Sequence, residues 1–230
     1  MDLVDIPTPS GFMPAHLALG AEGQPARIPI VLVHEAFGLN SHIASIADRL
    51  AARGHDVIAP HLYYRRTREA AGYDNVPLAV ELSSEMPVAD IVADVEAAAA
   101  VVSRGGPVAV MGFCFGGAVA YIAAAQSTVL DRAVSYYPVS ILTYWDRVGV
   151  PKAPLLVYFG DNDEFLGPDE RAWLAGLHED PATNMEIVVF PGAGHAFFND
   201  ARPALYNEGP AVETWRTTLE FLDAPIGATR

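Results

Sequence analysis

The sequence is poor in cysteine and in positive charge. Cys114 is the only cysteine among 230 residues, so no intrachain disulfide can form and cysteine usage gives no sign of an oxidising compartment. The 14 lysines and arginines are outnumbered by 28 acidic residues, which gives a formal net charge of −14. A chain of this charge is repelled by phosphate backbones and anionic lipid. We therefore expect no nucleic-acid partner.

Long apolar runs are also lacking. The most apolar stretches, residues 28–33 and 116–125, are far shorter than the roughly 20 residues that a membrane-spanning helix needs. The first residues are acidic and are followed by prolines, so they do not show the basic segment and apolar segment of a secretion signal. These absences predict a protein that has no membrane partner and stays in the cytoplasm.

The chain does contain what a folded core requires. Hydrophobic residues make up 51% of the sequence and charged residues 18%, a balance that excludes a disordered chain. A chain of this length buries roughly three-quarters of its unfolded surface. The sequence has no repeat, low-complexity tract or Ser/Gly-rich linker, so we predict one domain over residues 1–230.

Strand-like and helix-like segments alternate along the chain. Apolar runs of strand length occupy residues 28–34, 55–59, 107–111, 132–137, 154–160 and 185–190. Helical patterns occupy residues 43–50, with Asn40 or Ser41 as N-cap, and 88–102, 118–126, 168–179 and 210–222. This alternation predicts an α/β fold with a mostly parallel central sheet and helices on both faces. Residues 3–19 are interpreted as an antiparallel hairpin at the sheet edge, and residues 60–85 as a long irregular loop.

Residues 112–116 read Gly-Phe-Cys-Phe-Gly, between a predicted strand and a predicted helix. This is the context of a nucleophile elbow, in which flanking glycines let the backbone pack around a strained central residue. The positive end of the helix would favour a thiolate at Cys114, and the N–H of Phe115 would face a developing oxyanion. The competing interpretation is a small, buried, inert cysteine.

A cysteine nucleophile needs a base and a group that orients the base. In α/β-hydrolases the chain order is nucleophile, acid, histidine, each after a successive late strand. Asp161 and Asp163 follow the strand predicted at 154–160, and His195 follows the one at 185–190. This order predicts an α/β-hydrolase fold with His195 as base. From the residues alone, either aspartate could be the acid.

The remaining histidines carry no metal-binding pattern. Residues 34–35 read His-Glu but are not part of an H-E-x-x-H motif. None of the histidines other than His195 has the spacing of metal ligands; they are at positions 16, 34, 42, 55, 61 and 178. We therefore predict no metal and no cofactor.

Four segments together resemble the dienelactone hydrolase family of α/β-hydrolases, the carboxymethylenebutenolidases. They are Val-His-Glu-Ala-Phe-Gly-Leu-Asn at 33–40, Ala-Pro-His-Leu-Tyr-Tyr-Arg at 59–65, Gly-Phe-Cys-Phe-Gly-Gly at 112–117 and Gly-His-Ala-Phe at 194–197. The resemblance implies a triad of Cys114, Asp163 and His195, because the family's acid lies in a Gly-x-x-Asp turn like that of residues 160–163. It implies a small ester or lactone as substrate. Separately, the stretch at residues 137–147 is too short for a lid domain, so we expect no large lid.

The resemblance also implies a role for the residues after the first long strand. The family places a glutamate there, matched by Glu35, which helps to deprotonate the resting thiol, and Ala36 would supply the second oxyanion N–H. Independently, a carboxylate that ends an apolar strand is costly unless it is paired. The alternative is a strand-end carboxylate that faces solvent.

The family binds its substrate carboxylate with two arginines, and this sequence matches one of them. Arg65 matches the first, whereas the position of the second, four residues after the histidine, is Asn199. Arg202 lies nearby, but we interpret it as a solvated turn residue. Arg65 and Asn199 are thus the predicted substrate-binding residues, and the departure at Asn199 leaves open whether the substrate is anionic.

The sequence thus predicts a cysteine-dependent ester or lactone hydrolase that acts through an acyl-cysteine, and two other functions are alternatives to it. An amidotransferase would need a glutamate two residues after the histidine, where this chain has Phe197. A non-catalytic or redox-sensing protein would use Cys114 as a sensor thiol. The expected partner is a small molecule, with the chain as a monomer or a weak homodimer.

Overall fold

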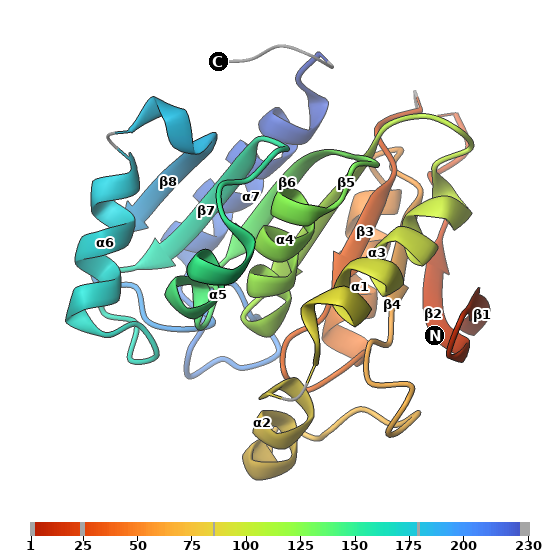
Figure 1. Cartoon of the computed structure of the whole chain (residues 1–230), viewed down its shortest axis with the longest axis horizontal. Helices are drawn as coiled ribbons and strands as arrows, with labels where there is room; N and C mark the ends of the chain where they lie inside the picture. Colours follow the sequence, from red (N-terminus) through yellow and green to blue (C-terminus); the bar gives the residue numbers. More distant parts are fainter. Residues whose placement is uncertain (1–2, 24–25, 85, 179, 226–230) are drawn as a thin grey trace.

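An eight-stranded sheet forms the centre of the computed structural model, which describes residues 3–23, 26–84, 86–178 and 180–225. The strands lie in the order β1-β2-β4-β3-β5-β6-β7-β8 (Figure 1). Their bounds are β1 Leu3–Thr8, β2 Gly11–Ala18, β3 Ile30–Val33, β4 Val57–Pro60, β5 Val108–Phe113, β6 Leu130–Tyr136, β7 Leu155–Gly160 and β8 Met185–Phe190. All pairs from β4 to β8 are parallel, as the alternating pattern predicts.

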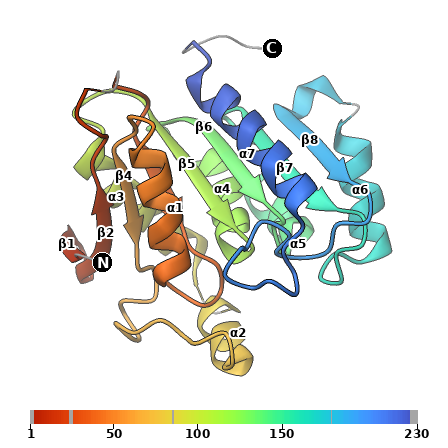
Figure 2. The ribbon, with the colours of Figure 1, turned by 180° about the vertical axis from the view of Figure 1, so that it is seen from behind.

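Helices cover both faces of the sheet. Figure 1 shows α3, α4 and α5 in front of the sheet, and Figure 2 shows α1 and α7 on the opposite face. The helices are α1 Ser41–Ala51, α2 Val76–Ser84, α3 Val88–Val102, α4 Phe115–Gln126, α5 Ile141–Val148, α6 Pro168–His178 and α7 Glu208–Asp223, with a 3₁₀ turn at Pro181–Thr183. Each face has its own apolar cluster. The predicted α/β-hydrolase fold without a large lid domain is confirmed.

The N-terminal hairpin lies where the sequence predicts it. β1 pairs with β2 in antiparallel register, from Leu3 opposite His16 to Thr8 opposite Gly11. β2 also runs antiparallel to β4, so the hairpin closes one edge of the sheet. The remaining strands read as continuous apolar runs because β3, β4, β5 and β7 are buried along their whole length.

Two helices were not predicted. Helix α2 lies inside the segment that was expected to be irregular, at the end of the sheet where the parallel strands finish (Figure 1). It buries Ala79 and Leu82 but leaves Val76 and Val80 exposed. Because apolar residues lie on both the buried and the exposed face, the sequence of this helix does not show the amphipathic pattern of a surface helix. Helix α5 begins after Ser140, which has a left-handed backbone and makes no side-chain cap. Helix α2 does have an N-cap, which the sequence interpretation overlooked: Asn75 Oδ1 accepts the Leu78 N–H at 3.3 Å.

The strand order reverses at β3. From β3 the chain passes through α1 to β4 on one side, and then returns through α3 to β5 on the other side. In open α/β sheets, ligands bind beyond the carboxyl ends of the strands at such a reversal. The segments that follow β3 and β5 carry Glu35, Ala36, Cys114 and Phe115. No helix within the described residues is long and apolar enough to cross a membrane.

The start of α4 packs directly on the end of β3, and this contact should be sensitive to one added methyl group. A Cβ at Gly116 would lie 2.5 Å from the Val33 carbonyl oxygen and 2.6 Å from that of His34. We expect Gly116→Ala to lower the free energy of unfolding by about 3 kcal/mol, because backbone atoms cannot move aside as side chains can. Urea unfolding measures the change.

Gly176 in α6 is the matched control for that substitution. An added Cβ there meets nothing within 4 Å, so Gly176→Ala should raise stability by about 0.5–1 kcal/mol through helix propensity. Equal stability of Gly116→Ala and the parent protein would contradict the close approach of α4 to β3.

Candidate active site

Cys114 lies on a strained turn between β5 and α4. Its backbone angles are φ 56° and ψ −116°, a conformation that costs a non-glycine residue about 1–3 kcal/mol. The surrounding structure holds the turn: the Cys114 N–H donates to the Tyr136 carbonyl at 2.9 Å. A Cβ at Gly112 would collide with the Gly116 carbonyl, so both flanking glycines are sterically required. The thiol is half-buried.

His195 and Asp163 are joined by a buried hydrogen bond. His195 Nδ1 lies 2.9 Å from Asp163 Oδ2, and both side chains are buried. The other Asp163 oxygen accepts the Phe165 N–H at 2.9 Å. Asp161 instead accepts the Gly192 N–H at 2.6 Å. Of the two aspartates that the sequence left open, Asp163 therefore contacts the histidine, and Asp161 ties its loop to that of His195.

The charge state of His195 is set by two partners. Burial lowers the pKa of His195, but hydrogen bonds to Asp163 and to Cys114 outweigh burial and raise the pKa to about 10. The structure therefore favours an imidazolium between a carboxylate and the cysteine sulfur. Phe165 packs edge-on against the ring, with centroids 4.6 Å apart, and limits its rotation.

Glu35 is a buried carboxyl with polar partners. Asn199 Nδ2 donates to Glu35 Oε2 at 2.8 Å, and the hydroxyls of Tyr73 and Tyr137 approach at 3.4 and 3.5 Å. Burial raises the pKa of Glu35, against the opposing effects of His195, Arg202 and the Asn199 hydrogen bond. The carboxyl faces the interior of the site and not solvent.

The two amides that the sequence proposed as oxyanion donors have no competing acceptor. Neither the Ala36 N–H nor the Phe115 N–H donates to any group in the part of the chain that the structure describes. Ala36 follows β3 and Phe115 begins α4, so the donors lie on either side of the strand reversal. Free amides at this position are suited to bind a developing negative charge.

Arg65 is paired inside the protein. Its two terminal nitrogens donate to the two carboxylate oxygens of Asp94, at 2.6 and 3.0 Å. Asp94 is fully buried in α3, and Tyr64 donates to it as well, at 3.1 Å. Removing a guanidinium from a buried carboxylate is costly. A substrate carboxylate would therefore compete with Asp94 for Arg65.

Asn199 and Arg202 lie beside Glu35. Besides Glu35, Asn199 Nδ2 contacts the Tyr73 hydroxyl at 3.0 Å. The Arg202 guanidinium lies 5.2 Å from the Tyr73 ring centre and 5.4 Å from that of Phe37. Arg202 is thus half-buried at the site, whereas the sequence interpretation put it in a solvated turn. Tyr73 was missed because it lies in the segment without periodicity.

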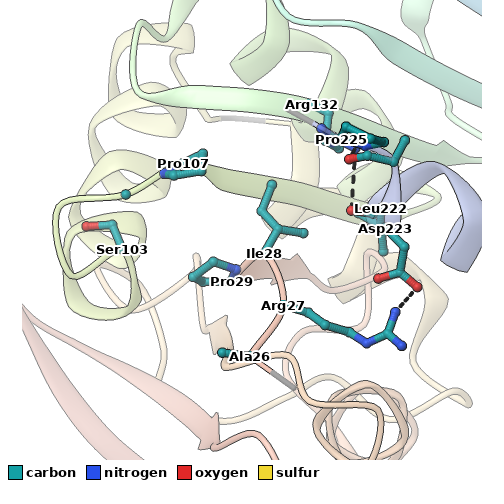
Figure 3. A pocket seen from close by; sticks show the side chains of 12 residues that line it. Ala26, Arg27, Ile28, Pro29, Ser103, Pro107, Arg132, Leu222, Asp223 and Pro225 are labelled. Carbon is teal, nitrogen blue, oxygen red and sulfur yellow. Dashed lines mark hydrogen bonds and ion pairs between the residues drawn. The ribbon is translucent and has the colours of Figure 1, made fainter. Parts of the chain in front are cut away.

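A separate pocket of about 480 Å³ lies at the opposite end of the sheet (Figure 3). Its lining includes Pro29, Pro107 and Arg132, which precede or begin strands β3, β5 and β6. An ion pair between Arg27 and Asp223 closes one side. The pocket is therefore remote from the cysteine. Among the described residues, no three His, Cys, Asp or Glu side chains are grouped to hold a metal ion.

Comparisons with known proteins identify the family of the chain. The model of the dienelactone hydrolase family matches residues 15–225. The carboxymethylenebutenolidase of Pseudomonas sp. (strain P51) is 34% identical over 229 residues, which cover 94% of this chain and 93% of that protein. A "Putative carboxymethylenebutenolidase" of Salmonella typhimurium (strain LT2) is 31% identical over 237 residues, or 95% of this chain and 85% of that protein.

A solved structure extends the comparison to the fold. The crystal structure of a "Putative Dienelactone Hydrolase" from Klebsiella pneumoniae superposes with a TM-score of 0.84 at 28% identity, and covers 96% of this chain and 97% of that one. The fold and the comparisons therefore define an α/β-hydrolase of the ester and lactone class. Within that class, the chain belongs to the dienelactone hydrolase family.

The raised pKa of His195 predicts how stability depends on pH. An unfolded histidine loses its proton near pH 6.5 and the folded one near 10, so the folded state binds more protons between these values. The stabilisation from charged His195 is complete below pH 6.5 and is lost as the pH rises to about 10. The free energy of unfolding of the parent, minus that of His195→Gln, should therefore decrease across this window in urea titrations.

His195→Gln cannot titrate and supplies the baseline for this measurement. A difference that stays constant or increases with pH would show that His195 is not charged in the folded protein.

Proposed function

We propose that the protein hydrolyses small esters or lactones through a Cys114-His195-Asp163 triad and an acyl-cysteine intermediate. The observation that carries the proposal is the cysteine on a strained strand-to-helix turn, together with a histidine that a buried aspartate orients and whose pKa the cysteine raises. Family membership independently supports hydrolysis of an ester or lactone bond.

In the first half-reaction the Cys114 thiolate attacks the acyl carbon. The carbonyl oxygen becomes an oxyanion, which the unpartnered N–H groups of Ala36 and Phe115 stabilise. When the tetrahedral intermediate collapses, the C–O bond breaks and the imidazolium of His195 gives its proton to the leaving oxygen. The acyl group remains on sulfur as a thioester.

The second half-reaction restores the enzyme. Neutral His195 takes a proton from water, which attacks the thioester and passes through a second oxyanion at the same two amides. Collapse releases the carboxylic acid and the thiolate, and His195 is again an imidazolium. Asp163 keeps the ring oriented throughout, because its hydrogen bond to Nδ1 leaves Nε2 for the proton transfers.

Glu35 fits the role of an additional proton acceptor. Burial raises the pKa of its carboxyl, and a carboxylate with a higher proton affinity is the stronger base. We assign to it the removal of the proton from any Cys114 that is still a thiol when substrate enters. Its hydrogen bond from Asn199 positions the carboxyl for that transfer.

Arg202 is the cation best placed to select an anionic substrate. Arg65 is engaged by the buried Asp94, whereas Arg202 makes no ion pair with any carboxylate that the structure describes. Its charge acts on Glu35, beside the catalytic cysteine. We therefore propose a lactone or ester that carries a carboxylate, with Arg202 as its main electrostatic contact and Arg65 and Asn199 as subsidiary ones.

Cys114→Ala tests the nucleophile. The variant should lose at least about 1,000-fold in kcat on p-nitrophenyl acetate, as expected when a covalent nucleophile is removed. Circular dichroism and urea unfolding establish that it folds. Full activity in the folded variant would refute the triad. If Cys114 of the parent protein is alkylated rapidly but the protein hydrolyses no ester or lactone, the sensor interpretation is favoured.

Arg202→Gln tests the substrate class. The variant should raise KM for a lactone with a free carboxylate by about 10-fold, the effect of losing a charge-assisted contact, and leave the methyl-ester analogue unaffected. Arg65→Gln should have the smaller effect on KM. Arg216→Gln changes the net charge equally but lies on the exposed face of α7, paired with Glu213 and Glu220, and is the control.

Equal effects of Arg202→Gln on the carboxylate lactone and on its ester would refute the assignment. If only Arg65→Gln raises KM for the carboxylate lactone, Arg65 and not Arg202 is the main contact of the substrate carboxylate.

A further inference from the structure

His34 lies beside the catalytic machinery but has no part in the proton transfers. It follows β3 directly, its side chain is completely buried, and it precedes Glu35 and Ala36. A buried imidazole must have its polar atoms satisfied, since an unpaired group costs about 1–3 kcal/mol. The hydrogen-bond partners of the two ring nitrogens therefore indicate what the side chain holds in place.

Both ring nitrogens of His34 bind backbone groups. Nδ1 lies 2.6 Å from the Glu35 carbonyl oxygen, and Nε2 lies 3.2 Å from the Leu62 nitrogen, which donates to it. A carbonyl can only accept, so Nδ1 carries the hydrogen, and an amide can only donate, so Nε2 offers its lone pair. The ring is thereby fixed in one neutral tautomer. Burial and the nearby His61 lower the pKa of His34 to about 3, which keeps it neutral.

The carbonyl that His34 binds shares a peptide group with the Ala36 N–H. This peptide is trans, so its C=O and N–H point in opposite directions in one plane. Holding the Glu35 oxygen therefore fixes the direction of the Ala36 hydrogen. The Gly38 N–H donates to the same oxygen at 3.1 Å, and the two donors together restrain rotation of the plane.

The following peptide and the second oxyanion donor are tied to the same group of side chains. The Tyr63 hydroxyl donates to the Ala36 carbonyl at 3.1 Å. The Tyr63 ring packs edge-on against His34, with centroids 4.8 Å apart, and lies 5.7 Å from the ring of Phe115. Both peptide planes that flank Ala36 are thus held from the side where His34 lies.

We propose that His34 is a positioning residue, which aims the Ala36 N–H at the oxyanion by binding the carbonyl of the Glu35–Ala36 peptide. This inference rests on the proposed function, because the Ala36 amide has a role only if an oxyanion forms. Geometric precision at such a donor matters, since removing one oxyanion-hole donor costs about 100- to 1,000-fold in kcat.

Two isosteric substitutions separate the two hydrogen bonds of His34. The side-chain nitrogen of asparagine can take the place of Nδ1, so His34→Asn keeps the donor to the Glu35 carbonyl and loses the acceptor for Leu62. The amide of glutamine reaches the place of Nε2, so His34→Gln keeps the acceptor and loses the donor. Both variants replace a buried ring by an amide, so they are matched for stability.

The measurement is the rate of Cys114 acylation by p-nitrophenyl acetate, compared with the rate of its alkylation by iodoacetamide. Alkylation needs the thiolate but forms no oxyanion. We expect His34→Gln to slow acylation and kcat by about 10- to 100-fold, a fraction of the loss of a whole donor, with KM and alkylation unchanged. His34→Asn should keep most of the acylation rate.

Three results would overturn the inference. They are normal acylation by His34→Gln, equal loss in the Asn and Gln variants, or a parallel fall in alkylation, which would indicate a structural role. Failure of the proposed function looks different, because turnover by the parent would then not depend on Cys114. A crystal structure of His34→Gln tests the positioning role without substrate. We expect the Glu35–Ala36 peptide to be rotated relative to the parent protein, and an unrotated peptide would refute its positioning by His34.

Discussion

The proposed catalytic arrangement depends on the close packing of the strand-to-helix turn at Cys114 against the end of β3. Gly116 lies so near the carbonyls of Val33 and His34 that no side chain fits between them. That contact sets the separation between the Phe115 amide at the start of α4 and the Ala36 amide after β3. It also holds Cys114 in a backbone conformation that it would not adopt alone. The packing of Gly116 against β3 offsets the free energy cost of the strained Cys114 backbone.

Two buried carboxyl groups near one cysteine differ in their partners, and this difference separates their chemistry. Asp163 accepts hydrogen bonds from His195 and from a backbone N–H, both of which stabilise a carboxylate. Glu35 has a neutral amide and phenols as partners, and burial raises its pKa. The first group is therefore suited to hold a charge and the second to accept a proton.

Most of the fold and the order of the site residues could be predicted from the sequence, because both depend on local pattern. Buried parallel strands read as apolar runs, and the elbow is a contiguous motif. The contacts of Arg65 could not be predicted, since its partner Asp94 lies 29 positions away on α3. Tyr73 was missed for a related reason: it follows no periodic pattern and reaches Glu35 only through the path of its loop. The sequence shows which residue stands at a motif position, whereas long-range packing decides whether its side chain is available to bind substrate.

The charge distribution shows why this distinction matters for recognition. With a net charge of −14, the field of the molecule as a whole opposes an approaching anion, and only a local excess of positive charge can attract one. A guanidinium neutralised by a buried carboxylate adds little to such an excess, whereas one that lies over aromatic rings keeps its charge available. Arg65 is in the first situation and Arg202 in the second. Under the proposed function, the family's two-arginine pattern can therefore be altered in sequence while the site keeps a cation, because an anionic substrate would respond to charge that no carboxylate neutralises and not to the position of an arginine in a motif.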